Sequence, residues 1–264
     1  MKKRKSMAYS LIDTIHRFEK FAPPSLASFD YVGLLLGDAR KKVERIGLTL
    51  DFSLLAMKKA VKMNCDALIT HHGPTEFEMP VLGNMKEKIK FCAQKNLTVY
   101  RAHLNLDFCQ GGIIETLCSL LDFKTQGTTL RYGKHTIKNG VRLSEEKLSL
   151  DEVIRRAKIL RPRTLRMAGP KRNRFERIAI TSGQGFFETF MGQLAPLDLY
   201  IAGEFEQEAV RAAEDMGITL LELTHHASEA RPLELIATKL SKILGVKVIF
   251  IETPDTIHSV DEVE

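Results

Sequence analysis

Short apolar runs of strand length alternate with amphipathic stretches of helix length along almost the whole chain. In the first half, strands are expected at 46–50, 67–70 and 97–102, and helices at 8–20, 53–63, 84–95 and 111–121. Ser53 is positioned to cap the second of these helices. The first helix is expected to pack through one face formed by Leu11, Ile12, Ile15 and Phe18. Such alternation is typical of a largely parallel sheet with helices on both faces, so an α/β fold is predicted.

The pattern breaks between about 124 and 136, where polar residues and glycine replace the apolar ones, and then resumes. In the second half, strands are expected at 164–168, 176–181, 197–202, 218–223 and 246–251, and helices at 150–159, 185–194, 204–216 and 229–243. Ser149 and Glu152 have the spacing of a capping box for the first of these helices. We expect two similar α/β lobes with mostly parallel sheets, 1–125 and 126–264. The C-terminal part is expected to pack back and complete a site in the cleft between the lobes.

Composition narrows the class of protein. The 264 residues include 39 Lys and Arg against 33 Asp and Glu, a net charge of +6. A basic stretch runs from Arg161 to Arg177, but no DNA-reading motif accompanies it, so nucleic acid is not an expected partner. No apolar run approaches the ~18 residues of a membrane span, and the four cysteines form no CxxC pair. We expect a soluble, cytoplasmic protein with reduced thiols and no membrane partner.

Three short polar clusters each follow an expected strand. They contain His71-His72, the segment from His103 to Asp107, and the segment from His225 to Glu229. In open parallel sheets, ligands bind in the crevice beyond the carboxyl ends of the strands. The three clusters are therefore candidates for one shared site, although they lie far apart in the sequence.

The residue types in these clusters suit a transition metal. Imidazole with carboxylate is a ligand set for Zn, Fe, Mn, Co or Ni, whereas Mg and Ca prefer oxygen alone. On a turn before Gly73-Pro74, His71 and His72 can serve two neighbouring ions, and His225 and Glu229 would share one face of a helix. A histidine after a strand is usually an ordinary loop residue, and one His-His pair is weak evidence. Three such clusters favour a metal site.

The chain resembles a family of dinuclear metal proteins, the Nif-three-like proteins or GTP cyclohydrolase 1 type 2 homologues. The resemblance covers most of the chain and is weakest between about 125 and 175. Its motifs are Phe21-Ala-Pro-Pro-Ser-Leu-Ala, Phe29-Asp-Tyr-Val-Gly-Leu, Thr70-His-His, Ala102-His-Leu-Asn-Leu-Asp, Ile201-Ala-Gly-Glu and His225-His-Ala-Ser-Glu. The His-His, His-x-Asn-Leu-Asp and His-x-x-x-Glu motifs in this order are a specific signal.

The resemblance implies two divalent transition-metal ions, such as Fe, Zn or Mn, in the cleft. Its implied ligands are His72 and Asp107 for one ion, His71 and His225 for the other, and Glu229 as a bridge. His103 would line the site and act as a proton donor or acceptor. Glu204, after Gly203, would be a partner of a ligand or a general base. A glutamate in the first turn of a helix is the equally good structural explanation for Glu204.

Some residues depart from the family pattern or have weaker signals. Phe29-Asp30-Tyr31 replaces Trp-Asp-Asn, and Arg101 and His226 replace smaller or aromatic residues. Arg101 would add affinity for an anion if it faced the crevice. Gly183-Gln184-Gly185 can bind a phosphate through backbone amides, but a tight turn explains it better. Cys109 lies close to Asp107 in the sequence, but a ligand role is not favoured.

Two functions compete at the sequence level. The first is a metal-dependent hydrolase of the GTP cyclohydrolase type or a phosphoesterase, in which metal-bound hydroxide attacks a small anionic or nucleotide substrate. The second is a non-enzymatic carrier of metal, such as iron, or a scaffold for a partner. The resemblance also implies a homo-oligomer such as a hexamer. Whether the chain is an enzyme stays open at this point.

Overall fold

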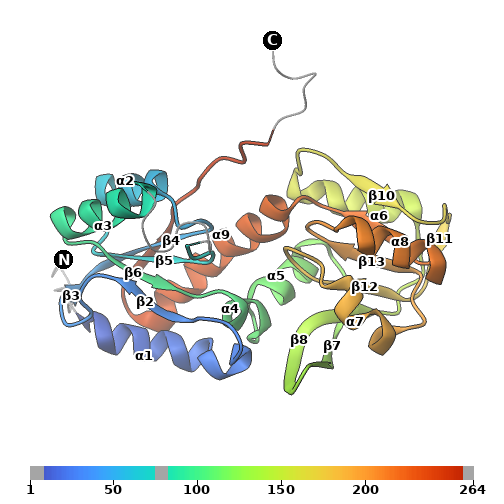
Figure 1. The fold of residues 1–264 in the computed structure, drawn as a ribbon, viewed down its shortest axis with the longest axis horizontal. Coiled ribbons are helices and arrows are strands. Elements are labelled where there is room, and N and C mark those ends of the chain that lie inside the picture. The colour runs from blue at the N-terminus through green and yellow to red at the C-terminus, as the bar shows by residue number, and fades with distance from the viewer. Residues whose placement is uncertain (1–8, 75–82, 258–264) are drawn as a thin grey trace, which may run out of the picture. The chain divides into compact units, whose positions relative to one another are not determined.

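The computed structural model describes residues 9–74 and 83–257, which form two compact units (Figure 1). The first unit comprises Met1–Cys109 with Leu233–Thr253, and the second comprises Gln110–Pro232 with Pro254–Glu264. The sequence suggests a division after residue 125 instead. The stretch that differs contains helix α5 (Ile113–Leu120), which contacts strand β8 (His135–Ser144) of the second unit.

The first unit is built on a five-stranded sheet. Its strands, in spatial order, are β15 (Lys247–Phe250), β4 (Arg45–Thr49), β5 (Ala67–Thr70), β6 (Thr98–Arg101) and β2 (Gly33–Leu36). All neighbours are parallel except β2, which is an antiparallel edge strand beside β6. The predicted parallel α/β sheet is confirmed for this unit.

Helices cover both faces of this sheet. Helix α1 (Leu11–Phe21) lies on one face, and α2 (Leu54–Lys62) and α3 (Gly83–Lys95) lie on the other (Figure 1). The second part of α9 (His225–Leu244) also belongs to this unit. The Ser53 side chain accepts from the backbone N–H of Ala56, as expected for the N-cap of α2. The face predicted for α1 is wrong at Ile12, which is 42% exposed, because the buried stripe runs through Leu11, Thr14 and Phe18.

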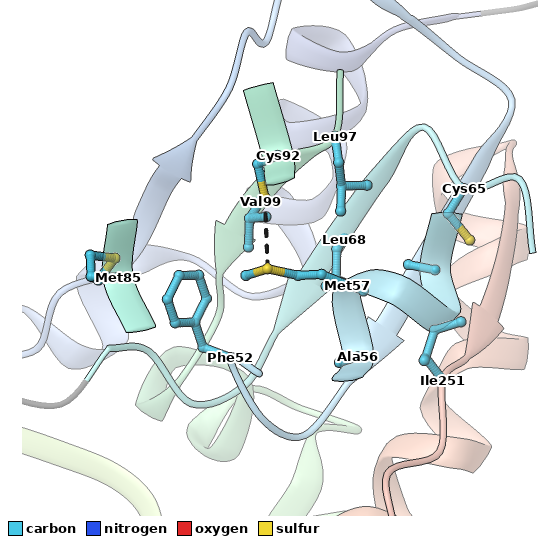
Figure 2. Packing of buried hydrophobic residues seen from close by; sticks show 11 residues of the cluster. Phe52, Ala56, Met57, Cys65, Leu68, Met85, Cys92, Leu97, Val99 and Ile251 are labelled. Carbon is cyan, nitrogen blue, oxygen red and sulfur yellow. Dashed lines mark hydrogen bonds between the residues drawn. The ribbon is translucent and has the colours of Figure 1, made fainter. Parts of the chain in front are cut away.

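The core under α2 and α3 is apolar and rich in sulfur (Figure 2). Met57 of α2 and Cys92 of α3 meet there, and the thiol of Cys92 donates to the thioether of Met57 at 3.7 Å. Burial raises the pKa of Cys92 to about 11, so this thiol stays protonated and packs as a small apolar group. All four cysteines are buried, and none of them forms a disulfide.

The second unit contains a six-stranded sheet. Its strands, in spatial order, are β10 (Arg166–Ala168), β14 (Thr219–Glu222), β13 (Leu199–Ala202), β12 (Ile178–Ile180), β8 and β7 (Gln126–Tyr132). Only β12–β13 and β13–β14 are parallel pairs, so the expectation of a mostly parallel sheet is wrong here. The stretch 124–136, expected to be a break, lies largely in a β-hairpin that turns through Gly133 (φ +56°) and Lys134.

Helices and short ribbons complete the described chain. The remaining elements are helices α4 (Leu104–Phe108), α6 (Leu150–Ala157), α7 (Phe187–Leu194) and α8 (Gln207–Met216), the 3₁₀ turns Pro24–Ala27 and Lys158–Leu160, and the two-residue strands β1 (Tyr9–Ser10), β3 (Lys42–Val43), β9 (Leu148–Ser149) and β11 (Arg174–Phe175). Strand β1 pairs with β3, and β9 pairs with β11. Of the helices in the described ranges, none has the length and apolar character to cross a membrane.

The predicted capping box at α6 forms only in part. The hydroxyl of Ser149 accepts from the backbone N–H of Glu152 at 3.2 Å. The carboxylate of Glu152 does not return to the cap, because it binds Arg155 and Arg156 instead.

We expect the Ser149→Ala variant to lower the free energy of unfolding by about 1 kcal/mol, because one backbone N–H of the first turn loses its acceptor. Urea denaturation followed by circular dichroism measures the change. Ser149→Asp, which keeps an acceptor at the cap, is the control and should retain most of the stability. Equal losses in both variants would show that the cap bond does not contribute.

Candidate metal centre

The tandem histidines are fixed by backbone bonds that continue the sheet beyond the end of β5. The N–H of His71 donates to Thr49 O at 3.0 Å, and the N–H of His72 donates to Leu50 O at 2.8 Å. The β4–β5 ladder thus extends past its last strand residue. Two imidazoles are thereby held at the carboxyl edge of the first unit's sheet, where the sequence predicts them.

His71 has only one consistent tautomer if it is neutral. Its side chain is completely buried, and Nδ1 donates to the carbonyl oxygen of Ala102 at 3.0 Å, since a carbonyl can only accept. Nε2 then carries a lone pair and lies 3.5 Å from Oδ2 of Asp107. Two acceptors that face each other in a buried place require a proton or a metal ion between them. This arrangement fits a cation.

His72 follows the same pattern with a carboxylate as its partner. Its Nδ1 lies 2.9 Å from Oδ1 of Asp51, so the nitrogen donates and Nε2 becomes the ligand atom. Hydrogen bonds of this kind fix the orientation of a histidine ligand and raise its basicity. Asp51 is not among the site residues predicted from the sequence, although its position directly after the expected strand 46–50 is a signal that could have identified it.

His103 completes a group of three imidazoles in the first unit. Nitrogen atoms of His71, His72 and His103 lie within 4.8 Å of one another, which suits a metal ion. The ring centroid of His103 is 4.9 Å from that of His71 and 5.8 Å from that of His72. The sequence predicts that His103 lines the site, and within this unit it does lie beside the two histidines.

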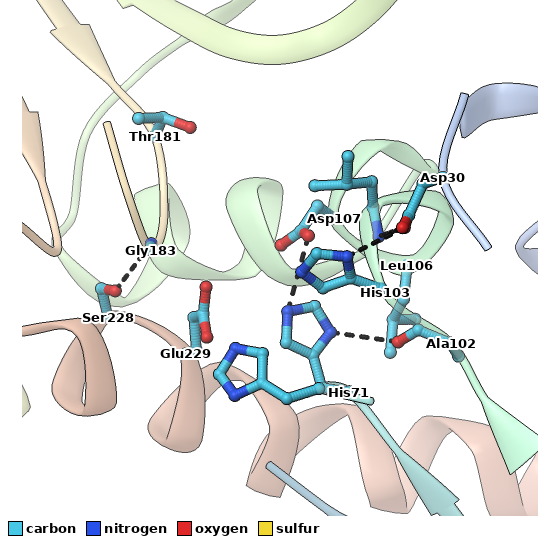
Figure 3. Close-up of polar contacts among 12 residues, drawn as sticks. Asp30, His71, Ala102, His103, Leu106, Asp107, Thr181, Gly183, Ser228 and Glu229 are labelled. Atoms are coloured by element: carbon cyan, nitrogen blue, oxygen red, sulfur yellow. Dashed lines mark hydrogen bonds and ion pairs between the residues drawn. The ribbon is translucent and has the colours of Figure 1, made fainter. Parts of the chain in front are cut away.

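The Nδ1 atom of His103 faces a donor and an acceptor at once. It lies 2.8 Å from Oδ2 of Asp30 and 2.8 Å from a guanidinium nitrogen of Arg101 (Figure 3 shows the Asp30 contact). A ring nitrogen either carries a hydrogen or accepts one, so these two contacts are alternatives. Nε2 can therefore act as an acceptor or a donor without any movement of the ring. This suits a group that transfers protons.

Asp30 and Arg101 form the support of His103. Burial raises the pKa of Asp30, but its hydrogen bond to His103 and the charges of His103 and Arg101 lower it more, so the carboxyl is ionised. Arg101 also bonds to Oδ1 of Asp30 at 3.0 Å and to the carbonyl oxygen of Tyr31 at 2.8 Å. The guanidinium of Arg101 therefore stabilises Asp30 and His103, in addition to any anion that it attracts to the crevice.

Asp107 lies on α4, a helix that the apolar pattern does not reveal because it spans only five residues. The side chain is 4% exposed. The neighbouring Asn105 anchors the helix by donating to Ala22 O at 2.7 Å, and the N–H of Leu104 donates to Asp30 at 3.2 Å. The segment is held at both of these points, so the position of Asp107 is well determined within the first unit.

In the second unit, His225 and Glu229 lie on one face of α9, as predicted from their spacing. Helix α9 begins at His225, and Nε2 of that residue lies 3.2 Å from Oε2 of Glu229. Nδ1 of His225 lies 2.9 Å from Oε1 of Glu204. Burial lowers the pKa of His225, but the hydrogen bonds to Glu204 and Glu229 outweigh this and raise it to about 10. The surroundings of His225 therefore favour positive charge.

Glu204 is not in the first turn of a helix, so that explanation is wrong. Helix α8 starts at Gln207, and Glu204 forms an isolated parallel bridge with Gln184. Its carboxylate orients His225 instead, in the manner that Asp51 orients His72. Asp51 in the first unit and Glu204 in the second thus have the same role, since each orients one histidine.

A narrow backbone turn accommodates the Glu229 carboxylate. A Cβ atom at Gly183 would lie 2.3 Å from Oε1 of Glu229. The N–H of Gly183 donates to the hydroxyl of Ser228 at 3.0 Å, and that of Gly185 donates to Glu204 O at 3.1 Å (Figure 3 shows the Ser228 bond). The Gly183-Gln184-Gly185 segment is therefore a tight turn whose two glycine amides already have acceptors.

Two other sequence candidates have ordinary structural roles. The thiol of Cys109 is buried and contacts Leu106 O at 3.5 Å. In the basic stretch from Arg161 to Arg177, Arg166 makes a two-pronged ion pair with Glu222, and Arg172 pairs with Asp198 at 3.3 Å. These acidic partners neutralise part of the stretch.

Comparison with known proteins matches residues 9–256 to the family Duf34/NIF3 (NGG1p interacting factor 3). A GTP cyclohydrolase 1 type 2 homolog of Clostridium perfringens is 31% identical over 255 residues, covering 91% of this chain and 95% of that protein. A protein of the same name from Methanocaldococcus jannaschii is 27% identical over 248 residues, covering 91% and 98%.

Solved structures share the fold. Reduced HcgD from Methanocaldococcus jannaschii is similar with a TM-score of 0.80 and 26% identity, over 94% of this chain and 100% of that chain. The Staphylococcus aureus hypothetical protein SA1388 has a TM-score of 0.79 at 19% identity, over 96% and 100%. The second likeness concerns the fold alone.

Gly183 and Gly133 allow a matched test of the turn beside Glu229. Both have positive φ, +57° and +56°, but a Cβ at Gly133 would meet nothing within 4 Å. We expect Gly133→Ala to cost about 1 kcal/mol of unfolding free energy through backbone strain alone. Gly183→Ala should cost about 1–3 kcal/mol more, because the carboxylate of Glu229 must also move.

Urea denaturation in the presence of a chelator measures both costs without a contribution from bound metal. Equal losses in the two variants would contradict the close contact between Gly183 and Glu229.

Proposed function

The chain belongs to the DUF34/NIF3 family, and from that premise we propose that it is a dinuclear divalent-metal protein acting as a metal-dependent hydrolase. One observation carries the proposal. His71, His72 and His225 each donate Nδ1–H to an oxygen acceptor, namely Ala102 O, Asp51 and Glu204. Each ring thereby presents Nε2 as its ligand atom, the arrangement that metal-binding histidines require.

We assign the ligands as the resemblance implies. His72 and Asp107 would hold one ion, His71 and His225 the other, and Glu229 would bridge them. The donor set of imidazoles and carboxylates suits Fe, Zn or Mn. Two divalent ions bring roughly +4 and the two carboxylates return −2, leaving a site of about +2 that attracts an anion. Bound ions of this kind supply Lewis acidity and lower the pKa of water.

The chain's own residues then have separate tasks. His103 moves a proton at Nε2, since its Nδ1 can exchange roles between Asp30 and Arg101. Glu204 acts as a positioning residue through His225 rather than as a general base. The proposed substrate is a small anion, such as GTP or another phosphoester. The same proposal includes a homo-oligomer such as a hexamer. It also includes a cytoplasmic location, which suits four cysteines that form no disulfide.

A metal carrier is the second candidate. The observation in its favour is that His72 and His225 are 27% and 32% exposed, whereas His71 is fully buried. Ligands that solvent reaches permit exchange with a client or a chelator. Rapid transfer of metal to a chelator, without turnover of any substrate, would favour the carrier over the hydrolase.

Metal content and turnover test the proposal together. Freshly purified protein should contain two divalent ions per chain by elemental analysis and hydrolyse GTP or another phosphoester. We expect His72→Ala to lose metal and activity, and His103→Gln to keep metal while its turnover falls about 10²–10⁴-fold. The exposed His16→Ala is the control and should change neither. Absence of bound metal after loading with Fe, Zn and Mn would refute the proposal.

The orienting carboxylates give a sharper test of the histidine geometry. We expect Asp51→Ala and Glu204→Ala each to weaken metal binding about 10–100-fold, because the ligand ring loses the acceptor that fixes it. Competition with a chelating dye measures the affinity. Asp38→Ala removes a carboxylate that pairs with the exposed Arg40 and orients no histidine in the described chain, so it should leave affinity unchanged. Unchanged affinity in all three variants would contradict the assigned tautomers.

A further inference from the structure

An apolar pocket of about 630 Å³ lies in the first unit, on the side of the sheet that carries α3. It is lined by Tyr31, Leu34, Leu35, Leu36, Phe52, Pro74, Met85, Ile89 and Arg101. This volume is in the range of small-molecule sites. Apart from Arg101, every described lining residue is aliphatic, aromatic, a methionine or a proline. Three of these side chains, Tyr31, Leu34 and Ile89, are 56%, 38% and 48% exposed, so an apolar surface is open to a ligand.

The pocket adjoins the residues that orient the histidines. Tyr31 follows Asp30, which contacts His103, and Phe52 follows Asp51, which contacts His72. Pro74 follows the tandem histidines after a single glycine.

Arg101 belongs to the pocket and to the His103 contact at the same time. Three of the lining residues, Tyr31, Phe52 and Arg101, are thus bonded or adjacent to groups of the candidate metal centre, and Pro74 lies two residues after His72. The pocket therefore adjoins that centre within one compact unit.

We propose that this pocket binds the apolar part of the substrate, and that the substrate is an aryl or alkyl phosphomonoester whose phosphate lies at the metal centre. The inference rests on the proposed function, which supplies the positive site for the phosphate. Charge complementarity sets the orientation, since the imidazoles and Arg101, where the proposed ions would be held, lie at one end and aliphatic side chains at the other.

The chemistry of the lining selects an apolar group over a nucleobase. The hydroxyl of Tyr31 already donates to Leu34 O at 2.8 Å. The two terminal nitrogens of the Arg101 guanidinium bind Asp30, Tyr31 O and His103. The third nitrogen, Nε, is buried, so solvent does not reach it, and it has no hydrogen-bond partner among the described residues. A purine that entered this pocket would bury donors and acceptors against leucine, phenylalanine and methionine, each at a cost. An aromatic hydrocarbon or an aliphatic chain carries no such cost.

Phosphonates that cannot be hydrolysed test the pocket by binding alone. The probes are methylphosphonate, 1-naphthylmethylphosphonate and the 5′-methylenephosphonate analogue of guanosine monophosphate, each titrated into metal-loaded protein. The chain has no tryptophan, so naphthyl fluorescence reports binding directly, and calorimetry covers the other two. We expect the naphthyl compound to bind about tenfold or more tightly than methylphosphonate and more tightly than the guanosine phosphonate.

A pair of exposed helix residues supplies the matched variants. Ile89 of α3 lines the pocket and is 48% exposed, whereas Leu55 of α2 is 46% exposed and does not line it. Ile89→Gln should weaken the naphthyl compound about fivefold and leave methylphosphonate and metal content unchanged. Leu55→Gln should change none of the three.

The outcomes separate the two proposals. If metal is bound and methylphosphonate binds, but the naphthyl compound has no advantage, the pocket proposal is wrong and the proposed function stands. Tighter binding of the guanosine phosphonate than of the naphthyl compound would also overturn it. If Ile89→Gln instead dissociates an oligomer in light scattering, a second copy of the chain covers the pocket, and the substrate assignment fails. A chain that holds neither metal nor methylphosphonate would overturn both proposals.

Discussion

The hydrogen bond from Nδ1 of a histidine to an oxygen acceptor is the interaction on which the candidate centre depends. In the first unit it is made by His71 to Ala102 O and by His72 to Asp51, and in the second by His225 to Glu204. A neutral imidazole has one donor and one acceptor, so the bond at one nitrogen decides the chemistry of the other. The strand ends and the start of α9 fix where these rings sit. The orienting oxygens fix what the rings can bind.

Burial of the carboxylates raises the free-energy cost of keeping them ionised. Asp107 and Glu229 are each almost completely buried, and an ionised carboxylate in such a place is costly without a compensating cation. Nε2 of His71 lies 3.5 Å from Asp107, and Nε2 of His225 lies 3.2 Å from Glu229. The tight turn at Gly183 leaves no space for a side chain above Glu229. A proton at His225, whose pKa is raised to about 10, is one way to compensate Glu229. A divalent ion held by such ligand atoms would compensate more charge than a proton.

Local patterns predict those parts of the structure that form a continuous apolar run or have a clear helical period. Strand β5 and helix α2 match the prediction within a residue or two, because every residue of β5 is buried and α2 buries Ala56, Met57 and Ala60 on one face. Strand β7 does not, since Leu130 is its only buried residue, and α4 is too short to show a helical period. The site residues are found by their position after strands. Their orienting partners are mostly not, because the Asp51–His72 and Asp30–His103 contacts join segments 21 and 73 residues apart.

In the first unit, the residues that orient the candidate metal ligands and the residues that line the apolar pocket occupy neighbouring positions. Asp30 and Asp51 turn toward histidines, whereas the next residues, Tyr31 and Phe52, line the apolar pocket. A substitution at Tyr31 or Phe52 therefore changes the shape and polarity of the pocket while the carboxylate beside it keeps the histidine in place. Tyr31 is also where the chain departs from the asparagine of the family pattern. The candidate metal ligands can thus stay the same while the group that binds in the neighbouring pocket differs. A relative's name that specifies a nucleotide therefore does not determine which group binds in this pocket.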